Sequence, residues 1–448
     1  MKKAFLFSGI MTLLLAGGGL SVATAQDKRW TMDECMRYAV EKSPAVRRQL
    51  HTNDTYKAEY QAAVAAFFPS LSTGVSARYN FGRAVDPETN TYVNTTTFGN
   101  SYDGSTSLPL FDGGQLVNQW RLAKISRQAG MNDLQKARDD LALSTLEAFV
   151  NVVYYRGTVR YTQEKREESQ RTLYKVRRQE ELGLKGKADV ALIEAQAAGD
   201  DYRLANQQHL YHTALLKLKE YMNYPAGETL EVDTVEAVTV VLYENEPAGD
   251  IYETAKETNP TARQAAWQVA IARRRHLIRK GALFPTISLS AGIYTSYYEN
   301  PEAETAPVAF RSQFANNRGE GIGISFSYPL FDRLARLTEV RRARNQVRIA
   351  QEQQTEVLQQ LQSAIEQSLA DRDGYARESI QMEKKLNADE LAYRVTLRKF
   401  EEGLMSPLDV QTSANTLIES RANLLQRKLM YLLKCRQVDY YKGKDLIN

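Results

Sequence analysis

Few residues of this chain have both the type and the spacing that catalysis or metal binding requires. His209 and His212 lie three residues apart on a predicted helix, so their imidazoles could share one metal ion. Neither belongs to an H-E-x-x-H motif, and two exposed histidines on a polar helix are the commoner explanation. The segment LGLKGKADV, 182–190, contains Gly and Lys but lacks the P-loop spacing and the Ser or Thr after the lysine. We therefore expect no enzyme activity, no metal site and no cofactor.

Composition excludes several other classes of protein. Hydrophobic residues are 43% and charged residues 25% of 448, which argues against a disordered chain. The mean hydropathy of −0.47 argues against a bundle of membrane helices. A net charge of +4 is too small to indicate nucleic acid as a partner. Only two cysteines occur, Cys35 and Cys435, which excludes a disulfide scaffold and a zinc ribbon.

The first 25 residues have the pattern of a cleaved signal peptide. Lys2 and Lys3 precede an apolar run from 4 to 16, and Ala23-Thr24-Ala25 forms a small-residue cleavage site before Gln26. The alternative is a membrane anchor that is never removed. No cysteine follows the site, so we expect no lipid attachment there, and no run of 18 or more apolar residues follows residue 26. The pattern predicts an exported protein.

The rest of the chain is an internal duplication. Matching segments lie 216 residues apart in two cases and 220 apart in two others: 39–49 with 255–265, Phe68-Pro69 with Phe284-Pro285, 108–112 with 328–332, and 182–190 with 402–410. Chance similarity would not keep this register over half the chain. We expect a signal peptide at 1–25, a first repeat at 26–225, a connection at 226–249 and a second repeat at 250–448. Each repeat is predicted to run helix, strand, strand, long helix, helix.

Period-two alternation predicts two strands in each repeat, at 71–81, 102–111, 286–298 and 321–330. Between 286 and 298, Ile287, Leu289 and Ile293 occupy one face, whereas Ser288 and Ser290 occupy the other. An apolar face opposite a small polar face is typical of a tilted strand with lipid on one side and water on the other. A soluble, half-buried sheet alternates in the same way and is the alternative.

Two further features favour the membrane. The segments that join the strands, 82–101 and 299–319, are predicted to be long polar loops on the extracellular side. Tyrosines gather near the strand borders, where an aromatic girdle would lie: Tyr79, Tyr92, Tyr102, Tyr294, Tyr297, Tyr298 and Tyr328.

Four strands cannot close a membrane barrel, because the smallest single-chain barrels have about eight strands. An open edge in lipid leaves backbone donors and acceptors unpaired, at a cost of several kcal/mol for each group. If the strands lie in the membrane, several copies of the chain must complete one barrel. Three copies would give twelve strands and a pore, whereas eight strands from two copies would have a filled interior.

Two segments, 113–182 and 332–402, contain no proline over about 70 residues, or roughly 100 Å if helical throughout. In the second segment, small or apolar residues recur at a 3–4 spacing that predicts a coiled-coil seam: Val340, Ala343, Val347, Ala350, Gln354, Val357, Leu361 and Ala364. Gly183 and Gly403 are helix C-cap signals, and a second helix is expected to return from near Asp189 or Asp409. Each repeat thus contains a helical hairpin whose tip lies far from the strands.

These features together resemble the TolC-type outer membrane efflux proteins. The resemblance covers the mature chain and includes the doubled motif G-L-x-x-x-x-D-V at 183–190 and 403–410, the S-P and N-P dipeptides, and the two PLFD segments. It implies an α+β protein of a Gram-negative outer membrane: a homotrimer with four strands per chain, a 12-stranded β-barrel, and a long periplasmic α-helical coiled-coil barrel. It also implies a tripartite efflux or type I secretion system, without separating the two. The partners would be outer membrane lipid, a periplasmic adaptor (membrane fusion) protein and an inner membrane pump.

The resemblance also implies roles for the hairpin tips. Gly183, Leu184, Gly403 and Leu404 would dock the adaptor. The entrance constriction of the family carries aspartates, of which Asp409 is the one that matches. Thr412 replaces the second aspartate, and Met405 replaces a tip arginine, so different contacts are expected to hold the entrance closed. The alternative for Asp409 and Asp189 is helix N-capping, which does not exclude a role in the pore.

The alternative to a channel is a periplasmic coiled-coil adaptor or tether without a pore. It would explain export and long helices, but not the two matched pairs of strands. The family plan brings both chain ends to the equator of the tunnel, so Cys35 and Cys435 could pair in an oxidising compartment.

Overall fold

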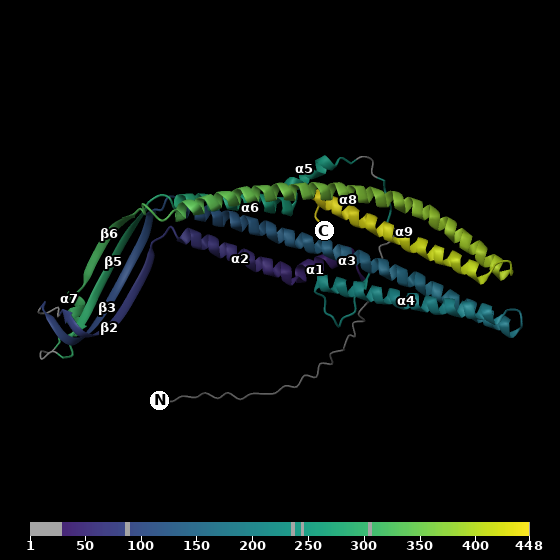
Figure 1. Ribbon diagram of the computed structural model, residues 1–448, viewed down its shortest axis with the longest axis horizontal. Helices are drawn as coiled ribbons and strands as arrows, with labels where there is room; N and C mark the ends of the chain where they lie inside the picture. The colour runs from purple at the N-terminus through teal and green to yellow at the C-terminus, as the bar shows by residue number, and fades with distance from the viewer. Residues whose placement is uncertain (1–28, 86–89, 234–237, 243–245, 303–306, 448) are drawn as a thin grey trace, which may run out of the picture.

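The computed structural model describes residues 29–85, 90–233, 238–242, 246–302 and 307–447. The predicted signal peptide lies outside this part. The molecule is elongated, with a β-sheet at one end and two helical hairpin tips at the other (Figure 1). No helix within the described ranges combines the length and the apolar character needed to cross a membrane.

The two repeats contain equivalent elements in the same order. The first repeat has α1 (Met32–Lys42), α2 (Pro44–Ala65), β2 (Ser70–Val85), β3 (Tyr92–Phe111), α3 (Gln115–Glu181) and α4 (Lys187–Met222). The second has α5 (Ala248–Thr258), α6 (Pro260–Gly281), β5 (Thr286–Glu299), α7 (Phe310–Asn316), β6 (Gly319–Ser327), α8 (Ala335–Glu401) and α9 (Pro407–Tyr441). The helix expected before each strand pair is preceded by a short additional helix, α1 or α5.

The S-P and N-P dipeptides divide these helices. Proline cannot donate a backbone hydrogen bond inside a helix but is favourable at the first helical position. Ser43 Oγ accepts hydrogen bonds from the backbone N–H groups of Ala45 and Val46 at 3.1 and 3.4 Å. Asn259 Oδ1 accepts one from Thr261 N at 2.9 Å. Each dipeptide therefore ends one helix and caps the next.

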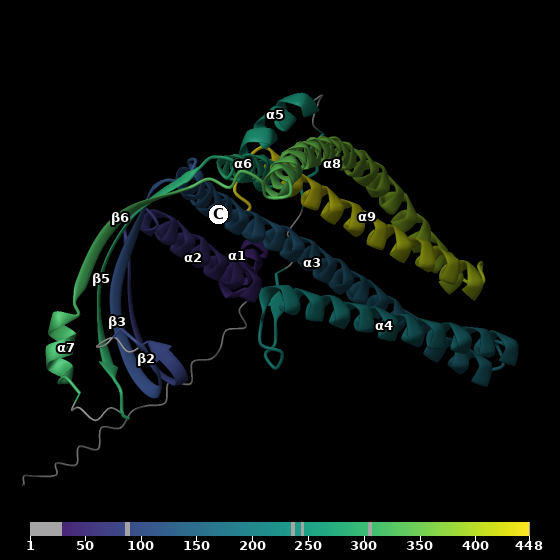
Figure 2. The same cartoon turned by 60° about the vertical axis from the view of Figure 1, so that its left-hand side comes forward.

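The helices form a curved layer in which α3 and α8 run the full length (Figures 1 and 2). Next to the sheet, α2, α3, α6 and α8 lie side by side in this order; toward the tips, α4 packs on α3 and α9 lies between α3 and α8. Each of α3 and α8 has 67 residues, about 100 Å at 1.5 Å per residue. All eight predicted seam positions of α8 are buried or half-buried, which confirms the seam.

The PLFD segments start the long helices. Asp112 accepts hydrogen bonds from Gly114 N at 3.0 Å and Leu116 N at 2.6 Å, and Asp332 accepts one from Arg336 N at 3.0 Å. In the first repeat the following turn is Gly113-Gly114, with φ of +70° and +79°. Gly113 is required there, because a Cβ atom would lie 2.1 Å from the carbonyl oxygen of Gly281.

The four predicted strands form one antiparallel sheet in the order β2-β3-β5-β6. The register places Ser72 opposite Ser105 and Ser76 opposite Ser101, and each pair of hydroxyls is hydrogen-bonded, at 2.8 and 2.7 Å. The serines therefore share one face. Large apolar side chains cover the other face and are exposed in the single chain, with Leu71 at 87% and Ile322 at 79%.

Two details of the predicted sheet are wrong. Segment 82–101 is not a long loop, because β2 continues to Val85 and β3 begins at Tyr92. Tyr294 and Tyr298 lie on the serine face, since side chains alternate along β5 and Ile293 and Tyr297 occupy the apolar face. Segment 299–319 does join β5 to β6 as predicted, and helix α7 occupies part of it.

The main core lies at the equator. Met36 and Ala39 of α1, Phe149 of α3 and Met222 of α4 are at most 1% exposed and pack together. A short parallel pair, β1 (Arg29–Trp30) with β4 (Glu231–Val232), closes this region. The core ties both ends of the first repeat to the middle of α3.

Candidate functional site

The hairpin tips end in the same left-handed turn. At the end of α3, Gly183 N donates to Glu180 O and Leu184 N donates to Gln179 O, both at 2.8 Å. Gly403 and Leu404 repeat this arrangement after α8, at 3.0 and 2.8 Å. This is the Schellman C-cap, in which the glycine adopts positive φ, here +75° and +78°. The conformation of the backbone, rather than a contact, requires glycine, because open space surrounds both positions.

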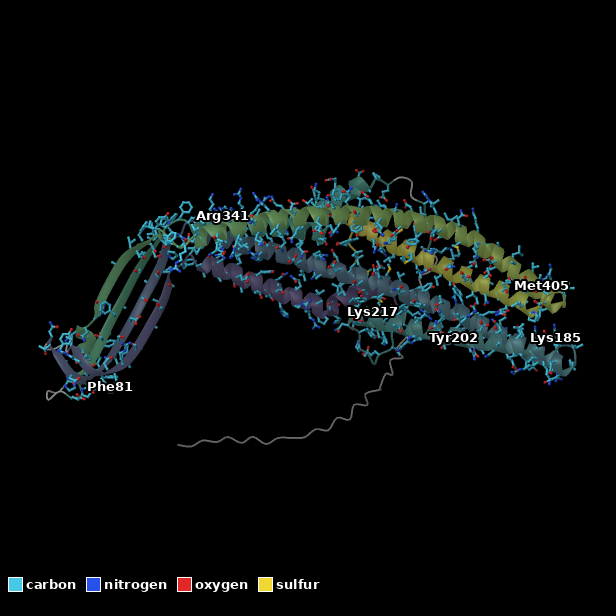
Figure 3. All side chains as sticks on the ribbon, in the orientation of Figure 1. Phe81, Lys185, Tyr202, Lys217, Arg341 and Met405 are labelled. Atoms are coloured by element: carbon cyan, nitrogen blue, oxygen red, sulfur yellow. The ribbon has the colours of Figure 1, made fainter. Side chains whose placement is uncertain are left out.

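The residue after each glycine is an exposed leucine. The side chains of Leu184 and Leu404 are 70% and 71% exposed, and Leu182 and Leu408 beside them are also exposed. Exposed apolar side chains at the end of a long polar hairpin are suited to contact with another protein. The glycines shape the two tips, at which Figure 3 labels the neighbouring Lys185 and Met405, and the leucines form their surface.

Asp409 caps its own helix. Its Oδ2 accepts hydrogen bonds from Ser406 N at 3.0 Å and Ser406 Oγ at 2.7 Å, while Ser406 Oγ accepts one from Asp409 N at 3.3 Å. This is a capping box, with Pro407 at the first helical position. The hydrogen bonds from the side chain and then the backbone of Ser406 hold the pKa of the Asp409 carboxyl below its ordinary value. The residue is exposed and stays ionised at neutral pH.

Asp189 is the counterpart of Asp409 in the first repeat. Its Oδ2 accepts a hydrogen bond from Gly186 N at 3.2 Å, but glycine has no side chain to complete the box. Thr412 lies three residues after Asp409 and is exposed, and its hydroxyl donates to Leu408 O at 2.9 Å. The capping alternative is thus observed at both aspartates, and Asp409 and Thr412 lie on one side of α9.

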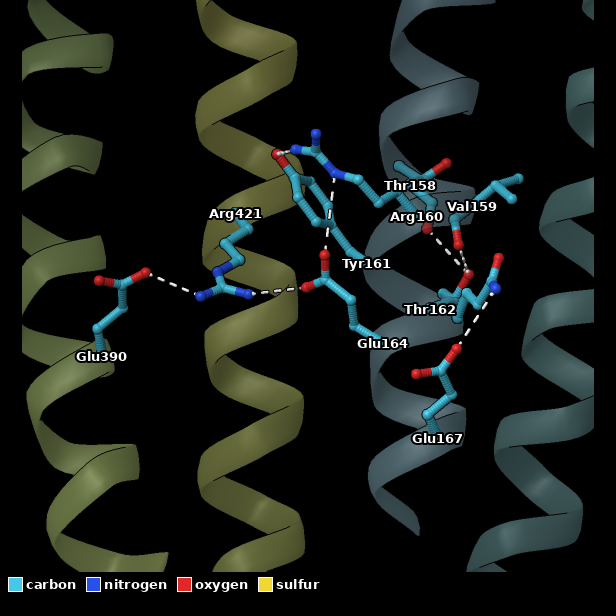
Figure 4. Close-up of polar contacts among 10 residues, drawn as sticks. Thr158, Val159, Arg160, Tyr161, Thr162, Glu164, Glu167, Glu390 and Arg421 are labelled. Carbon is cyan, nitrogen blue, oxygen red and sulfur yellow. Dashed lines mark hydrogen bonds and ion pairs between the residues drawn. The ribbon is translucent and has the colours of Figure 1, made fainter. Parts of the chain in front are cut away.

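An ionic contact that no sequence pattern indicates joins the two hairpins between the equator and the tips (Figure 4). Arg421 of α9 donates to Glu164 of α3 at 3.3 Å and to Glu390 of α8 at 3.0 Å. The first contact crosses between the hairpins, whereas the second stays within one hairpin. Residues 164 and 421 are 257 positions apart, so no local pattern relates them.

A second contact between the hairpins lies close to Arg421. The Tyr393 hydroxyl of α8 donates to the Glu168 carboxylate of α3, and Lys165 Nζ lies 3.7 Å from the same carboxylate. Burial and then the hydrogen bond to Glu168 raise the pKa of the Tyr393 phenol. These side chains and Arg421 line a cavity of about 370 Å³ between the hairpins. Parting of the tips would break both contacts.

The histidines and cysteines lie apart from this region. His209 and His212 are both exposed on α4, and no group of three metal-binding side chains occurs among the described residues. Cys35 packs in the equatorial core, whereas Cys435 faces Tyr431 on the other side of α9. The neighbouring Arg436 of α9 lies 3.6 Å from Asp33 of α1. The two cysteines, both in the described part of the chain, form no disulfide with each other.

Comparison with known proteins finds relatives among outer membrane proteins. The model of the family described as outer membrane efflux protein matches residues 36–224 and again 251–439. Outer membrane protein TolC of Escherichia coli (strain K12) is 23% identical over 436 residues, which cover 94% of this chain and 83% of the relative. Its counterpart from Salmonella enteritidis is 24% identical, over 96% of this chain and 85% of the relative.

Solved channel structures share the fold. CusC superposes with a TM-score of 0.79 at 15% identity, over 94% of this chain and 96% of the other. The CmeC outer membrane channel of Campylobacter jejuni superposes with a TM-score of 0.81 at 14% identity, over 93% and 87%. The double match of the family model shows the duplication directly.

Proposed function

Because this chain belongs to the outer membrane efflux protein family and is an efflux channel of a Gram-negative outer membrane, we propose that three copies assemble into one channel. The main support for this proposal is the four-stranded sheet. Its two edges, β2 and β6, have no partner strand among the described residues, and its apolar face is exposed. Three copies close the edges into twelve strands, with the apolar face toward lipid and the serines toward water.

The long helices of three copies would continue the barrel into a periplasmic tunnel. Each copy supplies a layer four helices wide, and both halves of α3 and α8 are flanked by shorter helices. Repeat boundaries near 26–225 and 250–448, with a connection at 226–249, are part of the proposal. A channel family implies transport rather than catalysis, and the partners would be a periplasmic adaptor and an inner membrane pump.

Native mass spectrometry in mild detergent tests the assembly. We expect a trimer that conducts ions in planar bilayers. A stable monomer would contradict the argument from the sheet edges. A periplasmic tether would fractionate away from the outer membrane, whereas the channel fractionates with it.

Adaptor docking at the tips needs a sharper test than substitution of the glycines. A side chain at Gly183 or Gly403 would strain the left-handed turn by about 1–2 kcal/mol, and would disturb the tip whether or not an adaptor binds there. Leu184→Asp with Leu404→Asp changes the exposed surface without changing the turn. We expect loss of efflux with intact trimers.

Leu216→Asp is the matched control, because Leu216 is also exposed but lies about 45 Å along α4 from the tip. Unchanged drug tolerance in the double tip variant, in a strain that depends on this channel, would remove the tips from the docking surface.

We also propose that the contacts between the hairpins hold the entrance closed. Arg421 with Glu164, and Tyr393 with Glu168, supply the contacts expected in place of the absent tip arginine. Asp409 and Thr412 would lie at the constriction, with three Asp409 carboxylates around the axis. Carboxylates held close together repel one another unless a cation lies among them, so such a ring would favour cations.

A further inference from the structure

A continuous series of aromatic rings crosses the apolar face of the sheet at the end far from the helices. From β2 it passes through Phe81, Tyr79, Phe98 of β3 and Tyr297 of β5, with ring-centroid distances of 6.3, 4.6 and 6.4 Å. Strand β6 has no aromatic residue at this end, because its outer residues are Gly319, Glu320 and Gly321. A girdle built from strands alone would stop at β5.

Helix α7 extends the series of aromatic rings. Phe310 and Phe314 are four residues apart, on one side of the helix. The Phe310 ring lies 5.3 Å from Tyr297, and the Phe314 ring lies 5.4 Å from Tyr102 and 5.6 Å from Phe310. Both views place α7 at the outer end of the sheet (Figures 1 and 2). The two phenylalanines thus supply the rings that β6 lacks.

The same helix covers the outer edge of β5, which extends beyond its pairing with β6. The Gln313 side chain accepts from Tyr298 N at 3.0 Å and donates to Tyr298 O at 2.7 Å, as a neighbouring strand would. Asn317 donates to Ser296 O at 2.8 Å. Helix α7 and the residue after it therefore occupy the place of a longer β6 and satisfy the backbone groups at this edge.

The strand at the other edge of the sheet, β2, is longer than β6. Strand β2 has sixteen residues and β6 has nine, so the β6 edge of one copy leaves seven residues of the next copy's β2 without a partner strand. The inner ends of both strands join helices, so the surplus lies at the outer end. Phe81, at this end, is 80% exposed. The exposed Arg311, Ser312 and Asn316 of α7 offer donors and acceptors for backbone groups there.

We propose that α7 closes the outer part of the seam between copies by packing on the outer end of β2 of a second copy of this chain. Phe81 and Tyr79 of one copy then contact Phe310 and Phe314 of the next, and the aromatic girdle runs around the whole barrel. The inference rests on the proposed trimer. Its occupant is a second copy rather than lipid, because lipid offers no partners for the backbone groups of the surplus residues.

Photo-cross-linking tests this contact in the full-length channel. Replacing Phe81 by p-benzoylphenylalanine keeps an aromatic side chain at the edge of β2. We expect irradiation to give dimers and trimers on denaturing gels, with the cross-link mapped by mass spectrometry to residues 310–318. The same replacement at Phe326, exposed on the same face but at the inner end, should give no cross-link to this segment.

Cross-links from position 81 only to lipid or within one copy would overturn the proposal, provided that native mass spectrometry still shows a trimer. Loss of the trimer in the parent protein would instead overturn the proposed function. As a second measurement, Phe310→Ser with Phe314→Ser should lower the temperature at which the trimer dissociates in detergent, compared with Ile293→Ser on the apolar face of the inner strand β5. Equal temperatures for the two variants would also count against the seam.

Discussion

Removal of one hydroxyl, in Tyr393→Phe, is expected to open the periplasmic entrance. The substitution keeps the ring of Tyr393 and deletes only its hydrogen bond to Glu168, one of the two polar contacts that join the hairpins at this cavity. A hydrogen bond to a charged group contributes about 1.5–3 kcal/mol. If the tips of three copies part together, three such hydrogen bonds are lost. At about 1.5 kcal/mol each, their loss totals about 4.5 kcal/mol, or roughly a 10³-fold change in the ratio of open to closed channels.

Arg421→Gln gives a graded comparison. Only its contact with Glu164 crosses between the hairpins, and the Glu164 side chain is 54% exposed, so solvent screens the pair. Such pairs contribute about 0.5 kcal/mol, so three copies give about 1.5 kcal/mol, or roughly tenfold. We therefore expect Tyr393→Phe to open the channel much more than Arg421→Gln does.

Single-channel recording in planar bilayers measures the open probability directly, and uptake of a large antibiotic measures it in cells. Tyr174→Phe is the matched control, because Tyr174 lies on α3 in the same half of the tunnel and is 75% exposed. A Tyr393→Phe trimer with the open probability of the parent would refute the reasoning, as would equal effects of Tyr393→Phe and Tyr174→Phe.

Three other predictions concern the tip, the thiols and the core. Asp409→Asn keeps an acceptor for the capping box and should reduce cation preference and cation block as much as Asp409→Ala does. Asp189→Asn should change neither property. An unchanged reversal potential in both Asp409 variants would exclude a ring of Asp409 carboxylates at the entrance. Mass mapping of fresh protein should find Cys35 and Cys435 as two thiols, and Cys435 should react slowly with alkylating reagents because burial raises its pKa. Phe149→Ala should destabilise the equator by about 3–5 kcal/mol, seen as earlier thermal loss of helical circular dichroism.

Features that depend on near neighbours could be predicted from the sequence alone. The left-handed turns at Gly183 and Gly403, the strand alternation and the coiled-coil seam of α8 were all predictable, because each depends on residues within a few positions. The duplication was equally visible, since each landmark occurs twice. The four-strand count followed from these patterns, and with it the need for other copies.

Which distant residues meet could be learned only from the folded chain. Nothing near Arg421 or Tyr393 indicates Glu164 or Glu168, because those contacts depend on how two hairpins pack across more than 200 positions. Helix α7 was missed because its stability comes from Phe310 and Phe314 on the sheet, and an isolated helix of seven residues is not stable in water. Cys35 of α1 and Cys435 of α9 stay apart because Cys435 lies on the side of α9 that faces away from the core around Cys35. Local rules specify the elements, whereas side-chain packing between elements specifies the entrance and the seam.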